Sequence, residues 1–125
     1  MLNNRKKGTA YEELAAKWLE TQGMKIICRN FRCRSGEIDL IGTQEHYLVF
    51  IEVKYRADTK CGEPEEAVGI SKQKTICRVA DFYRLTNGYT EQTSIRYDVV
   101  AICGEKITWY PNAFMHHYQG TGRKW

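Results

Sequence analysis

Three charged residues in two neighbouring apolar segments have the types and spacing needed for chemistry. Asp39 lies in GEIDLI (residues 36–41), and Glu52 and Lys54 lie in FIEVKYR (residues 50–56). Burying a charge without a partner is costly, so strands ordinarily carry apolar residues on a buried face. These charges therefore require either ion pairing or a chemical role to explain them.

Strand geometry predicts that the three side chains lie together. Side chains alternate along a strand, so Glu52 and Lys54 share one face and are about 7 Å apart along the backbone. The short polar segment TQEH (residues 43–46) separates the two apolar runs, which favours an antiparallel hairpin. In such a hairpin, Asp39 would lie beside the strand that carries Glu52.

Two carboxylates at this separation repel each other, and one lysine neutralises only part of that repulsion. Mg²⁺ or Mn²⁺ would remove it, because such cations take carboxylate and carbonyl oxygens as ligands. A cation held by Asp39 and Glu52 could polarise a phosphate oxygen and activate a water molecule. Lys54 could orient that water or stabilise negative charge on the phosphate. This constellation predicts hydrolysis of phosphodiesters.

Two alternative interpretations remain open from the residues alone. The Glu52–Lys54 pair could be an ion pair that protects a sheet edge, although edge protection does not require Asp39. Glu12 fits a capping box with Thr9 as N-cap. Glu12 could instead be a third carboxylate near the metal, and Glu13 would be its replacement.

Periodicity predicts one α/β domain, a mixed sheet flanked by helices, in 125 residues. Residues 1–8 are expected to form a flexible basic arm, residues 57–64 a mobile loop and residues 119–125 a flexible tail. The expected elements are helices at 9–22, 65–87 and 111–119, with strands at 24–32, 36–42, 47–56, 94–103 and 106–110.

Composition excludes several classes of protein. No apolar run approaches the roughly 18 residues of a membrane helix, and no apolar region follows the basic N-terminus as in a signal peptide. The chain has an odd number of cysteines, five, and no CxxC motif. This favours a protein of the reducing cytoplasm over one held together by a disulfide framework. A zinc site combining Cys28 and Cys33 with His116 and His117 would have looser spacing than structural zinc usually shows.

Basic clusters with interleaved aromatic residues suit a nucleic-acid backbone. The net charge is only +4, so a solvated basic surface is the alternative explanation. The candidate phosphate-contacting residues are Arg5, Lys6, Lys7, Arg32, Arg34, Arg56, Lys72 and Lys74.

The acidic and basic residues at 39–54 also resemble a known pattern. Asp39 followed by Glu52-Val53-Lys54 resembles the D-x(n)-(D/E)-x-K core of the PD-(D/E)xK nuclease superfamily. From about Gly8 to Phe114, the chain resembles the YraN-like family of small bacterial proteins. The matching stretches are YEELAAKWLETQG, RNFRCRSGEIDLIG, VFIEVKYR, GEPEEAV, KQK, RYDVVAI and PNAF.

This resemblance implies a restriction-endonuclease-like or Holliday-junction-resolvase-like fold and a homodimer. It also implies that Glu12 is the acid of the first helix, that Asp39 and Glu52 are metal ligands together with the Val53 carbonyl, and that Lys54 is the catalytic lysine. Two positions depart from the superfamily pattern. Ile38 stands where proline is common, and Cys77 replaces the tyrosine expected four residues after Gln73.

The leading functional expectation is a Mg²⁺-dependent endonuclease that hydrolyses DNA, including branched or structured DNA. A nucleic-acid-binding protein without turnover is the second hypothesis, and a structural or adaptor protein is the third. Neither a serine-hydrolase elbow nor a phosphate-binding or dinucleotide-binding glycine motif is present, so no organic cofactor is expected.

Overall fold

Two helices and five strands make up the computed structural model, which describes residues 4–56 and 68–118, with side chains described from residue 9 onward. The expected mobile loop (residues 57–64) and the expected flexible tail (residues 119–125) both lie outside these residues. The elements are α1 (Asn4–Thr21), β1 (Lys25–Cys33), β2 (Gly36–Gln44), β3 (Tyr47–Arg56), α2 (Ile70–Thr86), β4 (Ser94–Cys103) and β5 (Lys106–Phe114).

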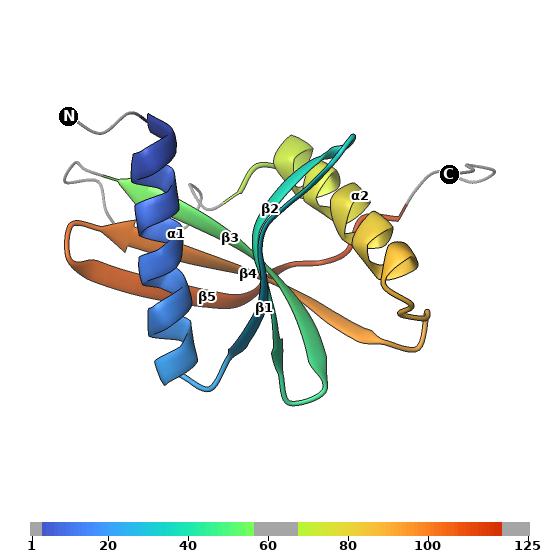
Figure 1. Cartoon of the computed structure of the whole chain (residues 1–125). Coiled ribbons are helices and arrows are strands. Elements are labelled where there is room, and N and C mark those ends of the chain that lie inside the picture. The colour runs from blue at the N-terminus through green and yellow to red at the C-terminus, as the bar shows by residue number, and fades with distance from the viewer. Residues whose placement is uncertain (1–3, 57–67, 119–125) are drawn as a thin grey trace.

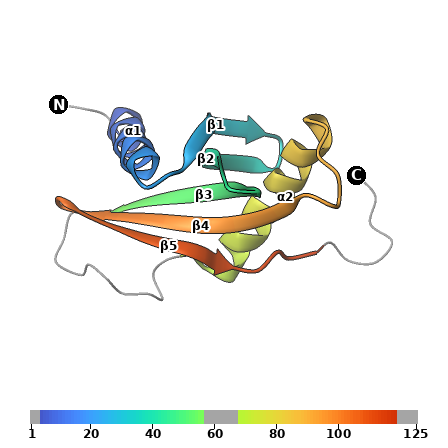
Figure 2. The same ribbon diagram turned by 90° about the horizontal axis from the view of Figure 1, so that it is seen from below.

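The strands form one sheet in the order β1-β2-β3-β4-β5, with β3 and β4 parallel and all other neighbours antiparallel. A parallel pair cannot be joined by a tight turn, and α2 lies in the connection between β3 and β4. The two helices cover opposite faces of the sheet (Figures 1 and 2). This arrangement confirms the predicted α/β fold and is consistent with a restriction-endonuclease-like fold.

Alternation along β3 divides the core into two clusters. Leu48 and Phe50 pack with buried residues of α2, whereas Val49 and Ile51 pack with Ala15, Ala16 and Leu19 of α1. Both faces of β3 are therefore apolar over this stretch, as expected for a strand covered on both sides. The predicted alternation of faces is confirmed for residues 48–51. Further along the same strand, Glu52 takes a position where the preceding residues are apolar.

The beginning of α1 differs from the prediction. The helix starts at Asn4, so Thr9 lies inside it and cannot be its N-cap, and the capping-box interpretation of Glu12 is wrong. Most of the expected basic arm is therefore helical. The predicted end of the helix is correct, because Gly23 has φ of 97° and the Met24 N–H bonds the Leu19 carbonyl. The start of the second helix also differs from the prediction, because α2 begins at Ile70 and not at residue 65.

The helix predicted over residues 111–119 is also wrong. The strand β5 continues through Pro111 to Phe114, and residues 115–118 have no regular structure. Pairing with β4 outweighs the local helical tendency, as the Val99–Tyr110 and Tyr97–Phe114 pairs show. Proline is tolerated there because β5 is an edge strand.

Cysteine chemistry differs in part from the expectation of reduced thiols. Cys28, Cys33 and Cys77 are free, whereas Cys103 at the end of β4 is disulfide-bonded. Pairing depends on the spatial approach of two β-carbons, which sequence spacing does not reveal. Among the described residues, no helix is long and apolar enough to cross a membrane.

Candidate active site

The strands β2 and β3 separate next to Asp39. Their antiparallel pairing confirms the predicted hairpin, and their ladder ends at the Leu40–Ile51 pair. One residue further, the Asp39 Oδ2 atom accepts a hydrogen bond of 2.8 Å from the Val53 N–H. A buried peptide N–H requires an acceptor, and here a side chain supplies it in place of the neighbouring strand. The backbone between Glu52 and Lys54 therefore fixes the position of Asp39.

Three carboxylates converge at this point. Glu12 on α1, and Glu37 and Asp39 on β2, each place a carboxylate oxygen within 4.8 Å of the others. The prediction included Glu12 and Asp39 but not Glu37. The spacing of Glu37 and Asp39 was the available signal, because residues two apart on a strand face the same side.

Glu52 lies beside this group on β3. Its side chain is only 14% exposed and shares a hydrogen bond with Asp39. The Lys72 Nζ atom on α2 lies 3.9 Å from Glu52 Oε2, and the charge of Lys54 also acts on Glu52. We name Glu12, Glu37, Asp39 and Glu52 the acidic cluster. It lies where α1, β2, β3 and the first turn of α2 meet.

Burial and mutual repulsion raise the pKa values within the acidic cluster. Burial, followed by the charge of Asp39, raises the pKa of Glu12 to about 7 and that of Glu52 to about 8. Lys72 and Lys54 offset part of the increase at Glu52. Burial also raises the pKa of Asp39, although the hydrogen bond from Val53 lowers it. Near neutral pH, the cluster therefore needs protons or a cation to offset its charge.

The donor set of the acidic cluster suits a divalent metal ion. Carboxylate oxygens are ligands that Mg²⁺ prefers. The Oε1 atom of Glu12 is buried and makes no hydrogen bond among the described residues, which leaves a lone pair available. Glu12, Glu37 and Asp39 could together hold a cation. Glu13, the predicted replacement for Glu12, is instead paired with Arg29 on β1 at 2.9 Å.

Edge protection does not explain the charges on β3, because this strand lies between β2 and β4 in the centre of the sheet. That alternative interpretation of Glu52 and Lys54 is therefore wrong. Gln73 does not join the acidic cluster. Its side chain bonds His117 Nε2 at 2.8 Å and the Val68 carbonyl at 3.0 Å.

Several predicted phosphate-contacting residues lie close to the acidic cluster. Arg32 pairs with Glu37 at 3.4 Å, and Lys72 approaches Glu52. Arg34 lies exposed in the turn between β1 and β2, and Lys74 is exposed near the start of α2. Arg56 is the last residue of β3. The structure therefore places Arg32 and Lys72 of the predicted basic set beside the carboxylates.

The remaining basic residues, Arg5, Lys6 and Lys7, belong to the first turns of α1, and their side chains lie outside the described part of the structure. The first turns of α1 and α2 and the hairpin between β1 and β2 all lie along the upper edge of the molecule in Figure 1. Backbone positions of most of the predicted basic residues thus share one edge.

Comparisons with known proteins identify relatives without a described activity. The model of the uncharacterised protein family UPF0102 matches residues 11–102. A UPF0102 protein of Lachnoclostridium phytofermentans is 45% identical over 90% of this chain and 96% of its own length. Relatives from Aliivibrio salmonicida and Clostridioides difficile are 44% and 38% identical, each over 90% of this chain, and cover 94% and 100% of their own lengths. The matched region contains every member of the acidic cluster.

Proposed function

Because the chain belongs to family UPF0102, whose description states no activity, we propose its function from the site: a Mg²⁺-dependent endonuclease that hydrolyses phosphodiester bonds in DNA, including branched or structured DNA. The family resemblance predicted from the sequence is confirmed by the family match. The placement in the PD-(D/E)xK nuclease superfamily is part of this proposal.

The observation that carries the proposal is the convergence of four carboxylates with two lysines. Glu12, Glu37 and Asp39 have oxygens within 4.8 Å of one another, and Glu52 is next to Asp39. Mg²⁺ or Mn²⁺ held there would supply Lewis-acid stabilisation of the phosphate and a more acidic water. Carboxylates alone would repel a phosphate, so an acidic cluster with Arg32, Lys54 and Lys72 beside it is more consistent with a metal-dependent site than with simple phosphate binding.

We propose that Lys54 acts on the substrate. It lies two residues beyond Glu52 on the same face of β3, and its charge reaches Glu52. In our proposal, the Lys54 ammonium group orients the attacking water and stabilises negative charge as it develops on the phosphate. Lys72 approaches Glu52 from α2, and would contact a non-bridging oxygen of the scissile phosphate or the next phosphate along the DNA strand.

Substrate positioning would come from the basic edge. Arginine and lysine contacts to the backbone fix the register of a nucleic acid without reading its bases. Arg34 and Lys74 are exposed on the hairpin and on α2, beside the elements that carry the acidic cluster. These residues would hold the duplex arms while the acidic cluster receives the scissile phosphate.

A nucleic-acid-binding protein without turnover is the second candidate. The same basic edge favours it, and it requires no metal-dependent step. Both candidates predict affinity that falls steeply with salt, because lysine and arginine contacts release counterions. Only the endonuclease predicts cleavage that requires both a divalent cation and Asp39.

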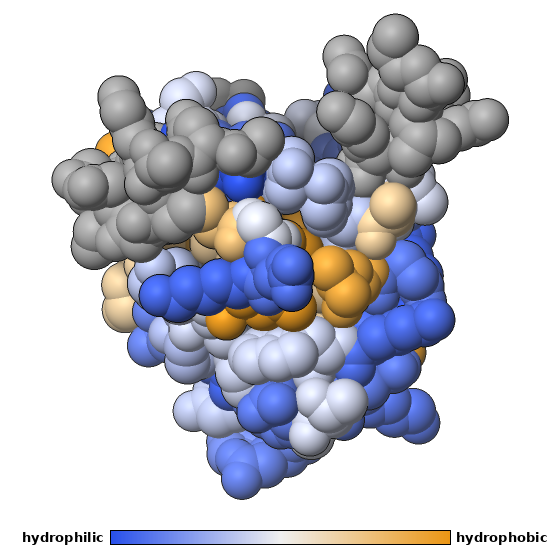
Figure 3. All heavy atoms as spheres, turned by 90° about the vertical axis from the view of Figure 1, so that its left-hand side faces the viewer, coloured by the Kyte–Doolittle hydropathy of each residue, from blue (hydrophilic) through white to orange (hydrophobic). Residues whose placement is uncertain are grey.

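A homodimer is part of the proposed endonuclease, since cutting two strands of opposite polarity calls for two sites related by a twofold axis. Hydrophobic side chains gather in the centre of the face shown in Figure 3, with hydrophilic side chains around them. Leu14 on α1 is 45% exposed. Light scattering of wild type and Leu14→Glu would test whether α1 belongs to the interface.

A cleavage assay tests the proposed function. End-labelled four-way junction, nicked duplex, linear duplex and single-stranded DNA are incubated with wild type in Mg²⁺, in Mn²⁺ and in EDTA. We expect metal-dependent cleavage of at least one substrate, lost in Asp39→Asn and in Lys54→Ala. Binding without cleavage on every substrate would favour the second candidate.

A further inference from the structure

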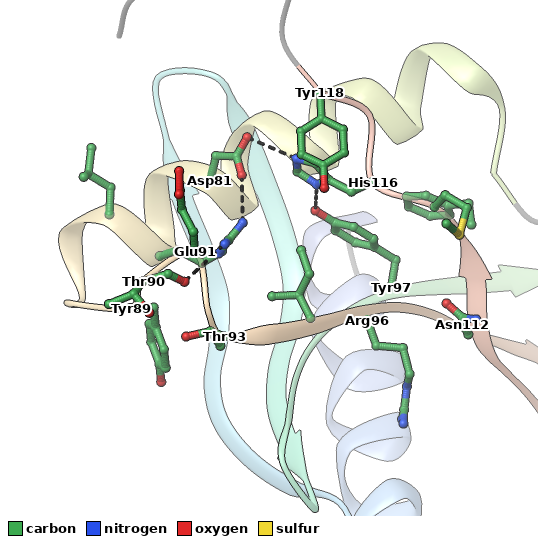
Figure 4. Close-up of a pocket in the computed structure, with 15 residues that line it drawn as sticks. Asp81, Tyr89, Thr90, Glu91, Thr93, Arg96, Tyr97, Asn112, His116 and Tyr118 are labelled. Carbon is green, nitrogen blue, oxygen red and sulfur yellow. Dashed lines mark hydrogen bonds and ion pairs between the residues drawn. The ribbon is translucent and has the colours of Figure 1, made fainter.

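A second polar site lies on the α2 side of the sheet, apart from the acidic cluster. It is a pocket of about 820 Å³, formed by the last turns of α2, the segment after it, the start of β4, the end of β5 and the residues after β5 (Figure 4). Lys72 and Arg84 are 12 residues apart on α2, so the helix rise separates the two sites by about 18 Å. The volume lies within the range of about 300–1,000 Å³ that is typical of small-molecule sites.

One wall of the pocket is a continuous chain of polar contacts. Arg84 lies 3.2 Å from Asp81 through Nη1 and donates to the Thr90 carbonyl at 3.4 Å through Nη2. The other Asp81 oxygen lies 3.4 Å from His116 Nε2, and His116 Nδ1 lies 2.6 Å from the Tyr97 hydroxyl. Figure 4 shows these side chains linked along the pocket.

This wall carries more positive than negative charge. The single carboxylate of Asp81 serves both Arg84 and His116. Burial lowers the pKa of His116, but the hydrogen bonds and charges of Asp81 and Cys77 together outweigh burial and raise that pKa to about 9, so the imidazole is protonated at neutral pH. Glu91 and Arg96 also line the pocket, and Arg96 is paired with Asp98. Arg84 and His116 are therefore the groups along this wall whose positive charge could attract an anion.

Arg84 has donor capacity to spare. Its contacts with Asp81 and Thr90 are long, and its buried Nε–H has no hydrogen-bond partner among the described residues. A buried donor without a partner costs free energy, which a rearrangement of the guanidinium group around a ligand would recover. Arginine suits phosphate oxygens because its N–H groups form a planar fork.

Aromatic and apolar side chains surround the polar wall. Tyr118 is 87% exposed with its ring edge-on to His116, and Met115 and Leu85 are 77% and 64% exposed. Thr93 also lines the pocket. A flat ring could lie against such a rim while a phosphate group reaches the guanidinium group of Arg84.

From this combination, we propose that the pocket binds a nucleoside monophosphate, with its phosphate held by Arg84 near the charged His116 and its base against Tyr118. This site is independent of the acidic cluster and of the proposed nuclease activity. It requires no divalent metal ion.

Calorimetry with dAMP in EDTA tests the proposal, with deoxyadenosine and inorganic phosphate as partial ligands. We expect saturable binding of dAMP by wild type, and binding at least tenfold weaker for each partial ligand. Arg84→Gln and Tyr118→Ala should each weaken dAMP binding at least fivefold. Tyr118 is exposed, so its replacement is not expected to affect folding, and circular dichroism of both variants verifies the fold.

Asp39→Asn is the matched control, because it alters the acidic cluster alone and should leave dAMP affinity unchanged. Absence of dAMP binding at millimolar concentration would overturn the proposal. Unchanged affinity in both pocket variants, or affinity lost in Asp39→Asn, would overturn it as well. None of these results depends on DNA cleavage, so failure here is distinct from failure of the proposed function.

Discussion

The Asp39 carboxylate accepts a hydrogen bond of 2.8 Å from the peptide N–H of Val53, one residue beyond the end of the β2–β3 ladder. The chain thereby uses a carboxylate, rather than the neighbouring backbone, to hold the residue between Glu52 and Lys54. This contact places Asp39 of β2 next to the strand segment that carries Glu52 and Lys54. Glu12 and Glu37 complete the group from α1 and from the start of β2.

Replacing Glu37 tests the member of the acidic cluster that sequence analysis did not identify. We expect Glu37→Gln to weaken Mn²⁺ binding at least tenfold, because its carboxylate lies with those of Glu12 and Asp39. Glu13→Gln is the matched control, since Glu13 pairs with Arg29 instead. Calorimetry on both variants is the measurement. Equal affinities in Glu37→Gln and wild type would remove Glu37 from the site.

The metal-free protein should lose stability as pH rises from about 5 to 8. The folded-state pKa of Glu52, about 8, lies above its ordinary value of 4.5, so the folded protein binds a proton more tightly than the unfolded chain. Ionisation of Glu52 therefore opposes folding, and Glu12 acts in the same direction. Urea unfolding in EDTA at several pH values measures the slope.

The variant Glu52→Gln isolates the contribution of Glu52. The raised pKa of His116 also makes stability fall as pH rises, between its ordinary value of 6.5 and its folded value of about 9. In Glu52→Gln we expect a shallower decline between pH 5 and 8, with the His116 contribution retained. Adding Mg²⁺ should stabilise wild type more at pH 8 than at pH 6. A variant whose pH slope matches that of wild type would contradict the assignment.

The parts of the site that sequence predicted are those determined by local geometry. Glu52 and Lys54 share a face because strands alternate, and a short connector made the hairpin with Asp39 predictable. Glu12 remained ambiguous because TAYE also fits a helix cap, and only the helix start at Asn4 decides between the two. Glu37 lies two residues before Asp39 on the same strand, so alternation predicts that they share a face, but the convergence of Glu12 on this pair depends on how α1 packs.

Features that depend on distant contacts could not be predicted in this way. The helix expected over residues 111–119 is replaced by a strand because β4 pairs with those residues up to Phe114. The approach of His116 to Asp81 joins two segments 35 residues apart through the same pairing and the packing of α2. No local periodicity encodes either contact.

Lys72 offers a test of the proposed nucleic-acid interface. We expect Lys72→Ala to reduce affinity for DNA several-fold and to lower the salt dependence by about one released ion. Lys106, at the hairpin between β4 and β5, is the control. It is exposed and lies on β5, which is not one of the elements that meet at the acidic cluster. Fluorescence anisotropy across a salt series gives both quantities. A larger effect from Lys106→Ala than from Lys72→Ala would place the DNA elsewhere.

Asp98 should matter for stability rather than for function. It is 1% exposed, pairs with Arg96 at 2.9 Å, and accepts hydrogen bonds from the Trp109 indole and the Asn112 N–H. Asp98→Ala leaves these donors and a largely buried arginine without their acceptor, at a cost of about 3–5 kcal/mol. Denaturant unfolding measures the loss. A change below about 1 kcal/mol would show that water or rearrangement replaces the carboxylate.

The central claim is that the acidic cluster binds a divalent cation, and calorimetric titration of Mg²⁺ and Mn²⁺ tests it most directly. The titrations compare wild type with Asp39→Asn and Glu52→Gln, with and without DNA to complete the coordination shell. We predict saturable binding by wild type that is lost or at least tenfold weaker in both variants. Absence of binding in wild type, even with DNA present, or unchanged affinity in Asp39→Asn, would contradict the account.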